Sequence, residues 1–166
     1  VPRARLRAVV EQIRHESLPC PARGLEFVLY PLAAARTLSV DPGFLLNLNT
    51  GSGIQFRTDY EPAEGEQHWF AIDRSVLAHN GVALYGPPAA EIFAAPPPSQ
   101  ILPLLAETIR WYLREAPGDE NGVLNAFRAL HFAREGTWVA KQCVRSKARQ
   151  AVAQVGGAEE FLRGAV

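Results

Sequence analysis

The spacing of apolar residues in the first part of the chain changes from helical to strand-like. From Arg3 to Ser17 apolar residues recur three or four positions apart, which predicts a helix. Pro19 and Pro21 follow, and they end the helix because proline lacks the backbone donor and restricts the residue before it. Leu25 to Tyr30 is almost entirely apolar, and Phe44 to Asn49 alternates between apolar and polar positions, so each predicts a strand.

The pattern after the second strand begins with turns and then becomes helical. Gly51-Ser52 lies in a predicted turn, Ile54 to Arg57 is a possible short strand, and Asp59 to Gly65 is a predicted surface loop. The predicted helical segments are Gln67 to His79, one turn at Ala90 to Ala94, Gln100 to Glu115, Glu120 to Glu135, Lys141 to Val155, and Gly157 to Arg163. Ser99 is a predicted N-cap and Gly136 a predicted C-cap.

Together these elements predict an α+β protein. Residues 1–65 form a small domain of mixed helix and strand, and residues 66–166 form a mainly helical bundle domain.

Composition narrows the range of functions. Lys plus Arg and Asp plus Glu both total 17, and this balance argues against a dedicated nucleic-acid-binding protein. No apolar run is long enough to predict a membrane span. Cys20 and Cys143 have no metal-ligand spacing, so we expect unpaired thiols in a reducing cytoplasm and no metal site made by cysteine or histidine.

Several motifs occur in an order that resembles a known family. The strings are LEF at Leu25 to Phe27, VALYGPPAAEIF at Val82 to Phe93, DENGVLNAFR at Asp119 to Arg128, and GTWVAK at Gly136 to Lys141. This series resembles the aminoglycoside nucleotidyltransferases of the streptomycin/spectinomycin adenylyltransferase type. The resemblance implies the last part of a nucleotidyltransferase sheet followed by a helical substrate-binding domain.

The resemblance also implies a reaction and its cofactors. Family members transfer AMP from ATP, with Mg²⁺, to a hydroxyl of a small cationic aminoglycoside or aminocyclitol. Their Gly-Ser turn and D-x-D strand should precede Glu26, but Val1 to Arg23 contains no Asp, and the chain contains no Met. We therefore expect a chain that lacks the front of the catalytic domain, is inactive alone and binds neither ATP nor Mg²⁺ tightly.

Glu26 corresponds to the family's third carboxylate. The resemblance implies that it acts as the catalytic base that accepts the proton of the attacking hydroxyl. The alternative is an edge-strand acid in solvent. Gly51-Ser52 followed by Asp59 imitates the missing motifs, but it follows the Glu26 strand and is interpreted as a turn and loop.

The beginning of the helix at Glu120 carries the predicted acceptor site. The resemblance implies that Asp119, Glu120, Asn121 and Asn125 offer acceptors to the amines of a cationic substrate. The alternative is helix capping, because acids at this end satisfy free N–H groups and complement the helix dipole.

Lys141 corresponds to the family's phosphate-binding lysine. Arg145, one turn later, is expected to assist it in binding the nucleotide phosphates. The alternative for Lys141 is a solvated helix start.

A different class of function stays open beside the transferase. The chain could be a non-catalytic module that binds a small molecule or a partner, or a domain retained for packing. The streptomycin-accepting members carry a Trp in the loop that corresponds to Arg114 to Gly118, and this loop has none. Spectinomycin, another aminocyclitol and an unrelated acceptor remain candidates, and the sequence leaves the choice between ATP and GTP and the oligomeric state open.

Overall fold

The computed structural model describes residues 1–18, 23–41, 43–62 and 67–146. The chain divides into two compact units, Val1–Pro96 and Pro97–Val166, which we call unit 1 and unit 2. Helices and a small antiparallel sheet occur together, so the prediction of a mixed α+β protein is confirmed at that level. The division at residue 65 stays a prediction, since compactness alone does not define a functional domain.

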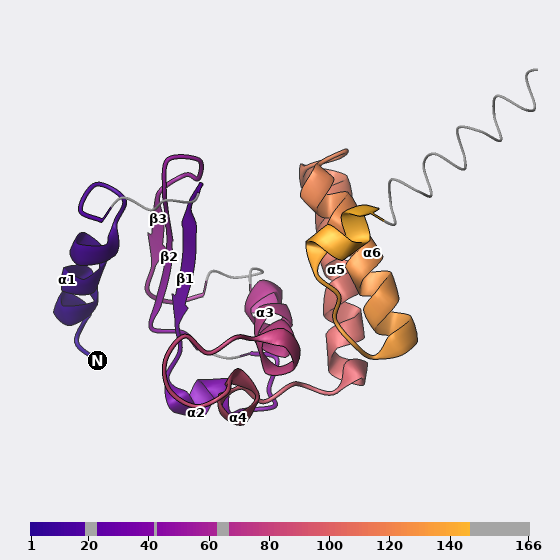
Figure 1. The fold of residues 1–166 in the computed structure, drawn as a ribbon, viewed down its shortest axis with the longest axis horizontal. Helices are drawn as coiled ribbons and strands as arrows, with labels where there is room; N and C mark the ends of the chain where they lie inside the picture. Colours follow the sequence, from indigo (N-terminus) through magenta and orange to yellow (C-terminus); the bar gives the residue numbers. More distant parts are fainter. Residues whose placement is uncertain (19–22, 42, 63–66, 147–166) are drawn as a thin grey trace, which may run out of the picture. The chain divides into compact units, whose positions relative to one another are not determined.

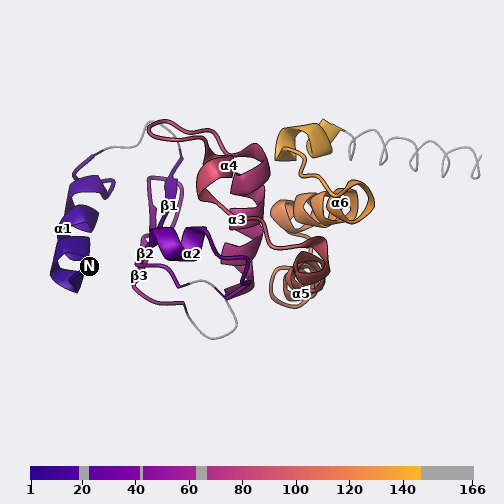
Figure 2. The same ribbon diagram turned by 90° about the horizontal axis from the view of Figure 1, so that it is seen from below.

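Unit 1 contains a three-stranded antiparallel sheet and four helices (Figure 1). Its elements are α1 (Arg3–Ile13), β1 (Leu25–Leu29), α2 (Leu32–Ala35), β2 (Leu46–Thr50), β3 (Arg57–Asp59), α3 (Gln67–Asn80) and α4 (Ala89–Ile92). The strand order is β1-β2-β3, so β2 is the central strand. Figures 1 and 2 show α1 on one side of the sheet and α3 on the other.

Strand alternation gives the sheet one apolar and one polar face. On β2, Leu46, Leu48 and Thr50 are buried, whereas Asn47 and Asn49 lie on the opposite face and are partly exposed. Val10 of α1 packs with Leu46 and Leu48 to form the core of this unit. The apolar side of α1 and the apolar face of β2 thus pack together and form one hydrophobic core.

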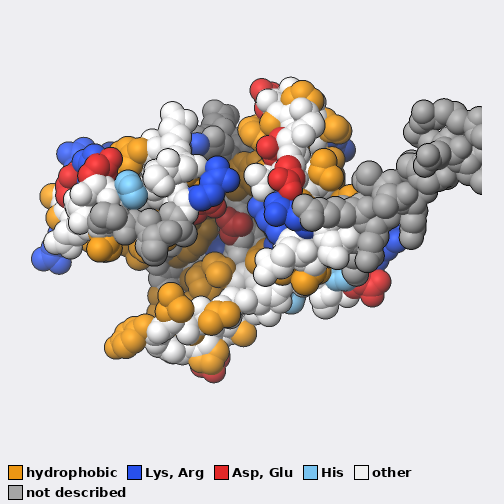
Figure 3. All heavy atoms as spheres, turned by 45° about the horizontal axis from the view of Figure 1, so that its top comes forward, with side chains coloured by type: hydrophobic (Ala, Val, Ile, Leu, Met, Phe, Trp, Pro, Cys, Tyr) orange, Lys and Arg blue, Asp and Glu red, His pale blue; other side chains and the backbone are white. Residues whose placement is uncertain are grey.

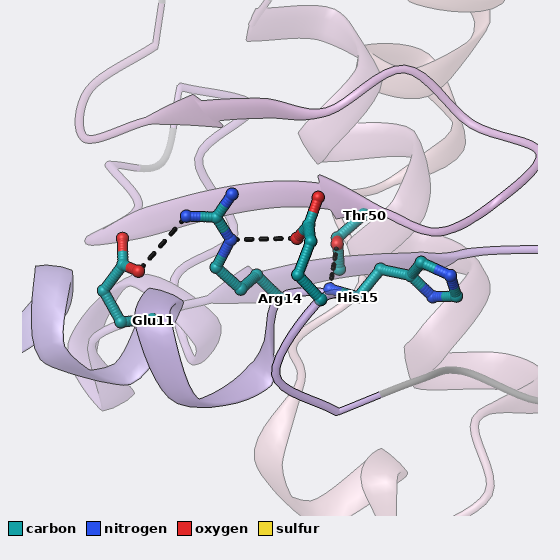
Figure 4. Close-up of polar contacts among 5 residues, drawn as sticks. Glu11, Arg14, His15 and Thr50 are labelled. Carbon is teal, nitrogen blue, oxygen red and sulfur yellow. Dashed lines mark hydrogen bonds and ion pairs between the residues drawn. The ribbon is translucent and has the colours of Figure 1, made fainter.

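Polar contacts hold the end of α1 on the sheet (Figure 4). The backbone N–H of His15 donates to Thr50 Oγ1 at 2.7 Å. Arg14 reaches Glu11 at 3.2 Å and Glu16 at 2.9 Å. The hydrogen bond to Arg14 lowers the pKa of the Glu16 carboxyl, and both acids raise the pKa of Arg14.

A buried arginine joins α3 to the segment after α2. Arg74 is fully buried, and its guanidinium donates to the carbonyl oxygens of Ala34, Thr37 and Ser39. Burial lowers the pKa of Arg74. Three carbonyl acceptors compensate the two Nη groups of the buried guanidinium, whereas its Nε has no hydrogen-bond partner among the described residues. This side chain therefore holds an irregular segment in place.

Unit 2 is built on two helices, α5 (Pro98–Glu115) and α6 (Glu120–Glu135), which pack against each other. Gly122 allows their close approach, because a Cβ there would lie 2.8 Å from Tyr112 Cδ1. After α6, Trp138 stacks on Phe132 with ring centroids 4.5 Å apart, and residues 141–146 are helical. The turn after α6 therefore folds back onto the helix.

Several predicted boundaries are wrong, for local reasons. Ser99 is not an N-cap, because α5 begins at Pro98, where the fixed backbone of proline suits the first helical position. Asp59 belongs to β3 rather than to a loop, since its strand pairs with β2. The short α2 was not predicted. Gly136 does end α6, in the left-handed conformation at φ 67°.

Two predicted segments extend past the described residues. Of the helix at 141–155 only residues 141–146 are described, and the helix at 157–163 lies outside the described part, as does Cys20. Among the described residues, no helix combines the length and the apolar character that crossing a bilayer requires.

Candidate functional site

The beginning of α6 gathers most of the predicted binding residues. The chain reaches it through Gly118, whose φ of 81° suits a tight turn. Asp119 then occupies the N-cap, where one carboxylate oxygen accepts the Gly122 N–H at 3.0 Å. The capping interpretation of Asp119 is therefore confirmed, and its contact with a ligand stays a prediction.

Two contacts join the predicted substrate residues to the predicted phosphate residues. Arg145 Nη2 lies 2.8 Å from Glu120 Oε1, and Lys141 Nζ donates to Asn121 Oδ1 at 3.3 Å. Lys141 and Arg145 are four positions apart on one helical segment, so they share a face. We call Asp119, Glu120, Asn121, Lys141 and Arg145 the α6 cluster.

The α6 cluster lies at the surface. The Arg145 and Glu120 side chains are 50% and 67% exposed, and Asn121 and Lys141 are also exposed. Figure 3 shows acidic and basic side chains next to one another at the surface. An ion pair in such a setting contributes little to stability, so its groups can exchange their partners for a ligand.

Asn125 is engaged inside the unit. Its Nδ2 donates to Tyr112 Oη at 3.2 Å, and its Oδ1 accepts from Arg128 at 3.4 Å. Arg128 also donates to the Val139 carbonyl at 3.0 Å and lies over the Trp138 ring. Asn125 and Arg128 thus brace α5, α6 and the following turn, a network that their spacing of three residues on a helix could have suggested.

Glu26 belongs to unit 1, on β1, where its side chain is exposed. Its direct neighbour across the strands is Asn49, and the neighbour of Asn49 on β3 is Arg57. The structure therefore places Glu26 in a polar row of three side chains, in a different unit from the α6 cluster.

The next cross-strand row contains Asn47 and Asp59, which are joined by a hydrogen bond. Asp59 accepts from Asn47 Nδ2 at 3.1 Å and pairs with Arg57 Nε at 2.8 Å. Among the described residues, no group of three or more His, Cys, Asp or Glu side chains could hold a metal ion. The described residues therefore do not fit a magnesium site.

Unit 1 also contains a half-buried tyrosine, Tyr30, whose hydroxyl oxygen is buried. The Tyr30 hydroxyl is buried without a hydrogen-bond partner among the described residues, and its ring meets Phe93 edge-on. Burial raises the pKa of Tyr30, the charge of Asp73 raises it further, and the charge of Arg74 opposes the rise.

No family model, curated protein or solved structure matches the chain.

Proposed function

We propose that the chain is the acceptor-binding part of an aminoglycoside nucleotidyltransferase-like protein. Such a protein transfers AMP from Mg-ATP to a hydroxyl of an aminocyclitol or aminoglycoside. The sheet of unit 1 would be the end of the nucleotidyltransferase sheet, and unit 2 would be the helical domain. The motif order from Leu25 to Lys141 is the origin of this proposal.

The observation that carries the proposal is the pairing inside the α6 cluster. Residues for an amine-bearing acceptor, Glu120 and Asn121, lie against residues for phosphate, Lys141 and Arg145. Glu120 and Asn121 lie about 20 residues before Lys141 and Arg145 in the sequence. Their contact supports one polar site that takes both positive and negative groups.

In the proposed reaction the acceptor oxygen attacks the α-phosphorus of ATP. The new P–O bond forms as the bond to pyrophosphate breaks, pyrophosphate leaves, and the hydroxyl proton passes to a carboxylate base, the role that the motif resemblance implies for Glu26. Lys141 and Arg145 would neutralise phosphate charge, while Glu120 and Asn121 would hold the amines and hydroxyls of the acceptor.

The acceptor-binding part of the proposal can be tested by calorimetry. Spectinomycin is titrated into the wild-type chain and into the double variant Glu120→Gln/Asn121→Ala. We expect binding to the wild type and affinity weaker by about tenfold in the variant, because a charged and a neutral hydrogen bond are lost.

A matched control is available on α5. Glu107 is also an exposed helical acid that pairs with arginines, Arg110 and Arg114. Glu107→Gln should leave the affinity unchanged. Equal affinity in all three proteins would show that the α6 cluster does not bind the acceptor.

The second candidate is a non-catalytic module that binds a cationic small molecule. The observation that favours it is the exposure of Glu120 and Asn121, whose carboxylate and amide can accept hydrogen bonds from a cationic ligand without any catalytic step. Its test is ATP binding followed by NMR. Because the chain is not expected to bind ATP tightly, a transferase part should show only a weak response to ATP at Lys141 and lose it in Lys141→Ala, whereas a module should show no response there.

A further inference from the structure

Helix α6 has apolar residues on two opposite sides. The side that packs within unit 2 holds the buried residues Leu124, Ala129 and Phe132. Val123, Phe127 and Leu130 lie on the other side, because the helix turns by about 100° per residue, and their exposed fractions are 48%, 37% and 48%. A single apolar side is enough for a helix at a protein surface, so the second one indicates an interaction surface.

Charged residues of opposite sign lie at the two ends of this second apolar side. Glu120 lies one turn before Val123, and Arg134 lies one turn after Leu130. Both charged residues are exposed. The row from Glu120 to Arg134 is about 21 Å long, at about 1.5 Å per residue. We call Glu120, Val123, Phe127, Leu130 and Arg134 the α6 outer face.

The order of residues in the α6 outer face is symmetric about Phe127. In an antiparallel pair of α6 helices, Phe127 meets the partner's Phe127, and Val123 meets the partner's Leu130. Glu120 then meets the partner's Arg134, and the two-fold axis repeats this ion pair at the other end. A parallel pair would instead place like charges together at both ends, which costs free energy. The charges therefore complement a second, antiparallel copy of the same helix.

We propose that the α6 outer face is the interface of a two-fold homodimer, in which α6 packs antiparallel on α6 of a second copy. Glu120 also pairs with Arg145 of its own chain, and its two carboxylate oxygens provide acceptors for both arginines. One helix face per copy buries less than about 1,200 Å², so the dimer is reversible, with a dissociation constant in the micromolar range. This inference is independent of the proposed function.

The test is sedimentation equilibrium of the full chain over a concentration series that spans the micromolar range. The average mass of the wild type should rise with concentration toward that of a dimer. Leu130→Glu should raise the dissociation constant by about tenfold or more, because it places a carboxylate in an apolar contact on both copies. A wild type that stays monomeric at every concentration would overturn the proposal.

Leu102→Glu is the matched control, since Leu102 is 38% exposed and belongs to α5. It should dimerise like the wild type, and circular dichroism should show both variants folded. Equal weakening by Leu102→Glu and Leu130→Glu would overturn the assignment of the interface to α6.

The antiparallel register has a test of its own by charge reversal. Arg134→Glu should raise the dissociation constant by about fivefold, because attraction becomes repulsion at two symmetry-related positions. The double variant Glu120→Arg/Arg134→Glu restores opposite charges at both ends and should recover most of the wild-type affinity. A double variant that dimerises as weakly as Arg134→Glu would overturn this pairing.

Discussion

The two units of the molecule differ in whether a charged side chain is buried or exposed. Unit 1 buries the guanidinium of Arg74 completely and surrounds it with three backbone carbonyl groups. Unit 2 keeps Lys141 and Arg145 at the surface, where each contacts one side chain of α6. A buried charge with a fixed set of acceptors stabilises the fold, whereas an exposed charge with one weak contact is available to a ligand.

The largest effect on stability is expected at the buried arginine of unit 1. Arg74→Met should lower the free energy of unfolding by about 4 kcal/mol, because three backbone carbonyl groups lose their common donor. Urea denaturation followed by circular dichroism measures the change. Arg74→Lys, which keeps the charge and part of the hydrogen bonding, should lose less. A loss below about 1 kcal/mol in Arg74→Met would contradict the structural role.

The buried hydroxyl group of Tyr30 in unit 1 predicts a pH dependence of stability. The pKa of Tyr30 is raised in the folded state, so above about pH 10 the unfolded chain loses a proton that the folded chain keeps. Stability should therefore fall above pH 10, by about 1.4 kcal/mol per pH unit. Tyr30→Phe should remove this component in urea denaturation series between pH 9 and about pH 11. Tyr85→Phe, at a fully exposed position, should keep the wild-type dependence.

A smaller effect is expected at the cap of α6. Asp119→Ala should lower the free energy of unfolding by about 1 kcal/mol, because the Gly122 N–H loses its acceptor. Asp119→Asn, which can still cap, should lose only a few tenths of this amount. If Asp119→Ala were as stable as the wild type, the capping contact would not contribute to the stability of unit 2.

The smallest effect on stability is expected at the exposed ion pair of unit 2. Arg145→Gln should change the free energy of unfolding by no more than about 0.5 kcal/mol, since its ion pair with Glu120 is half exposed. Thermal and urea unfolding of the variant measure this value. A loss comparable to that of Arg74→Met would mean that the α6 cluster is a structural device and not a binding surface.

Features that depend on local chemistry could be predicted from the sequence. α6 begins and ends at the predicted residues, because Asp119 and Gly136 satisfy opposite ends of the helix. The alternation of apolar and polar residues in β2 likewise predicts which of its side chains are buried and which are partly exposed. By contrast, the four residues of α2 are too few to show a helical period. Pro97 and Pro98 precede Ser99, and α5 begins at Pro98, before the N-cap that was predicted.

Features that depend on distant contacts could not be predicted in this way. An arginine in a helix pattern normally lies in solvent, and nothing near Arg74 in the sequence indicates carbonyl acceptors some 35 to 40 residues earlier. The engagement of Asn125 by Tyr112 depends on the packing of α5 on α6. The contacts of the α6 cluster depend likewise on the turn that Arg128 and Trp138 fold back onto α6.

The stacking of Trp138 on Phe132 gives unit 2 an optical signal of its own. Trp138 is 6% exposed, whereas Trp111 is 36% exposed, so a water-soluble quencher should reduce their fluorescence to different extents. Replacing Trp69 and Trp111 by Phe would leave a single indole whose emission moves to longer wavelength when the turn leaves α6. The same protein would report on ligand binding at Lys141, since that residue follows directly on this turn.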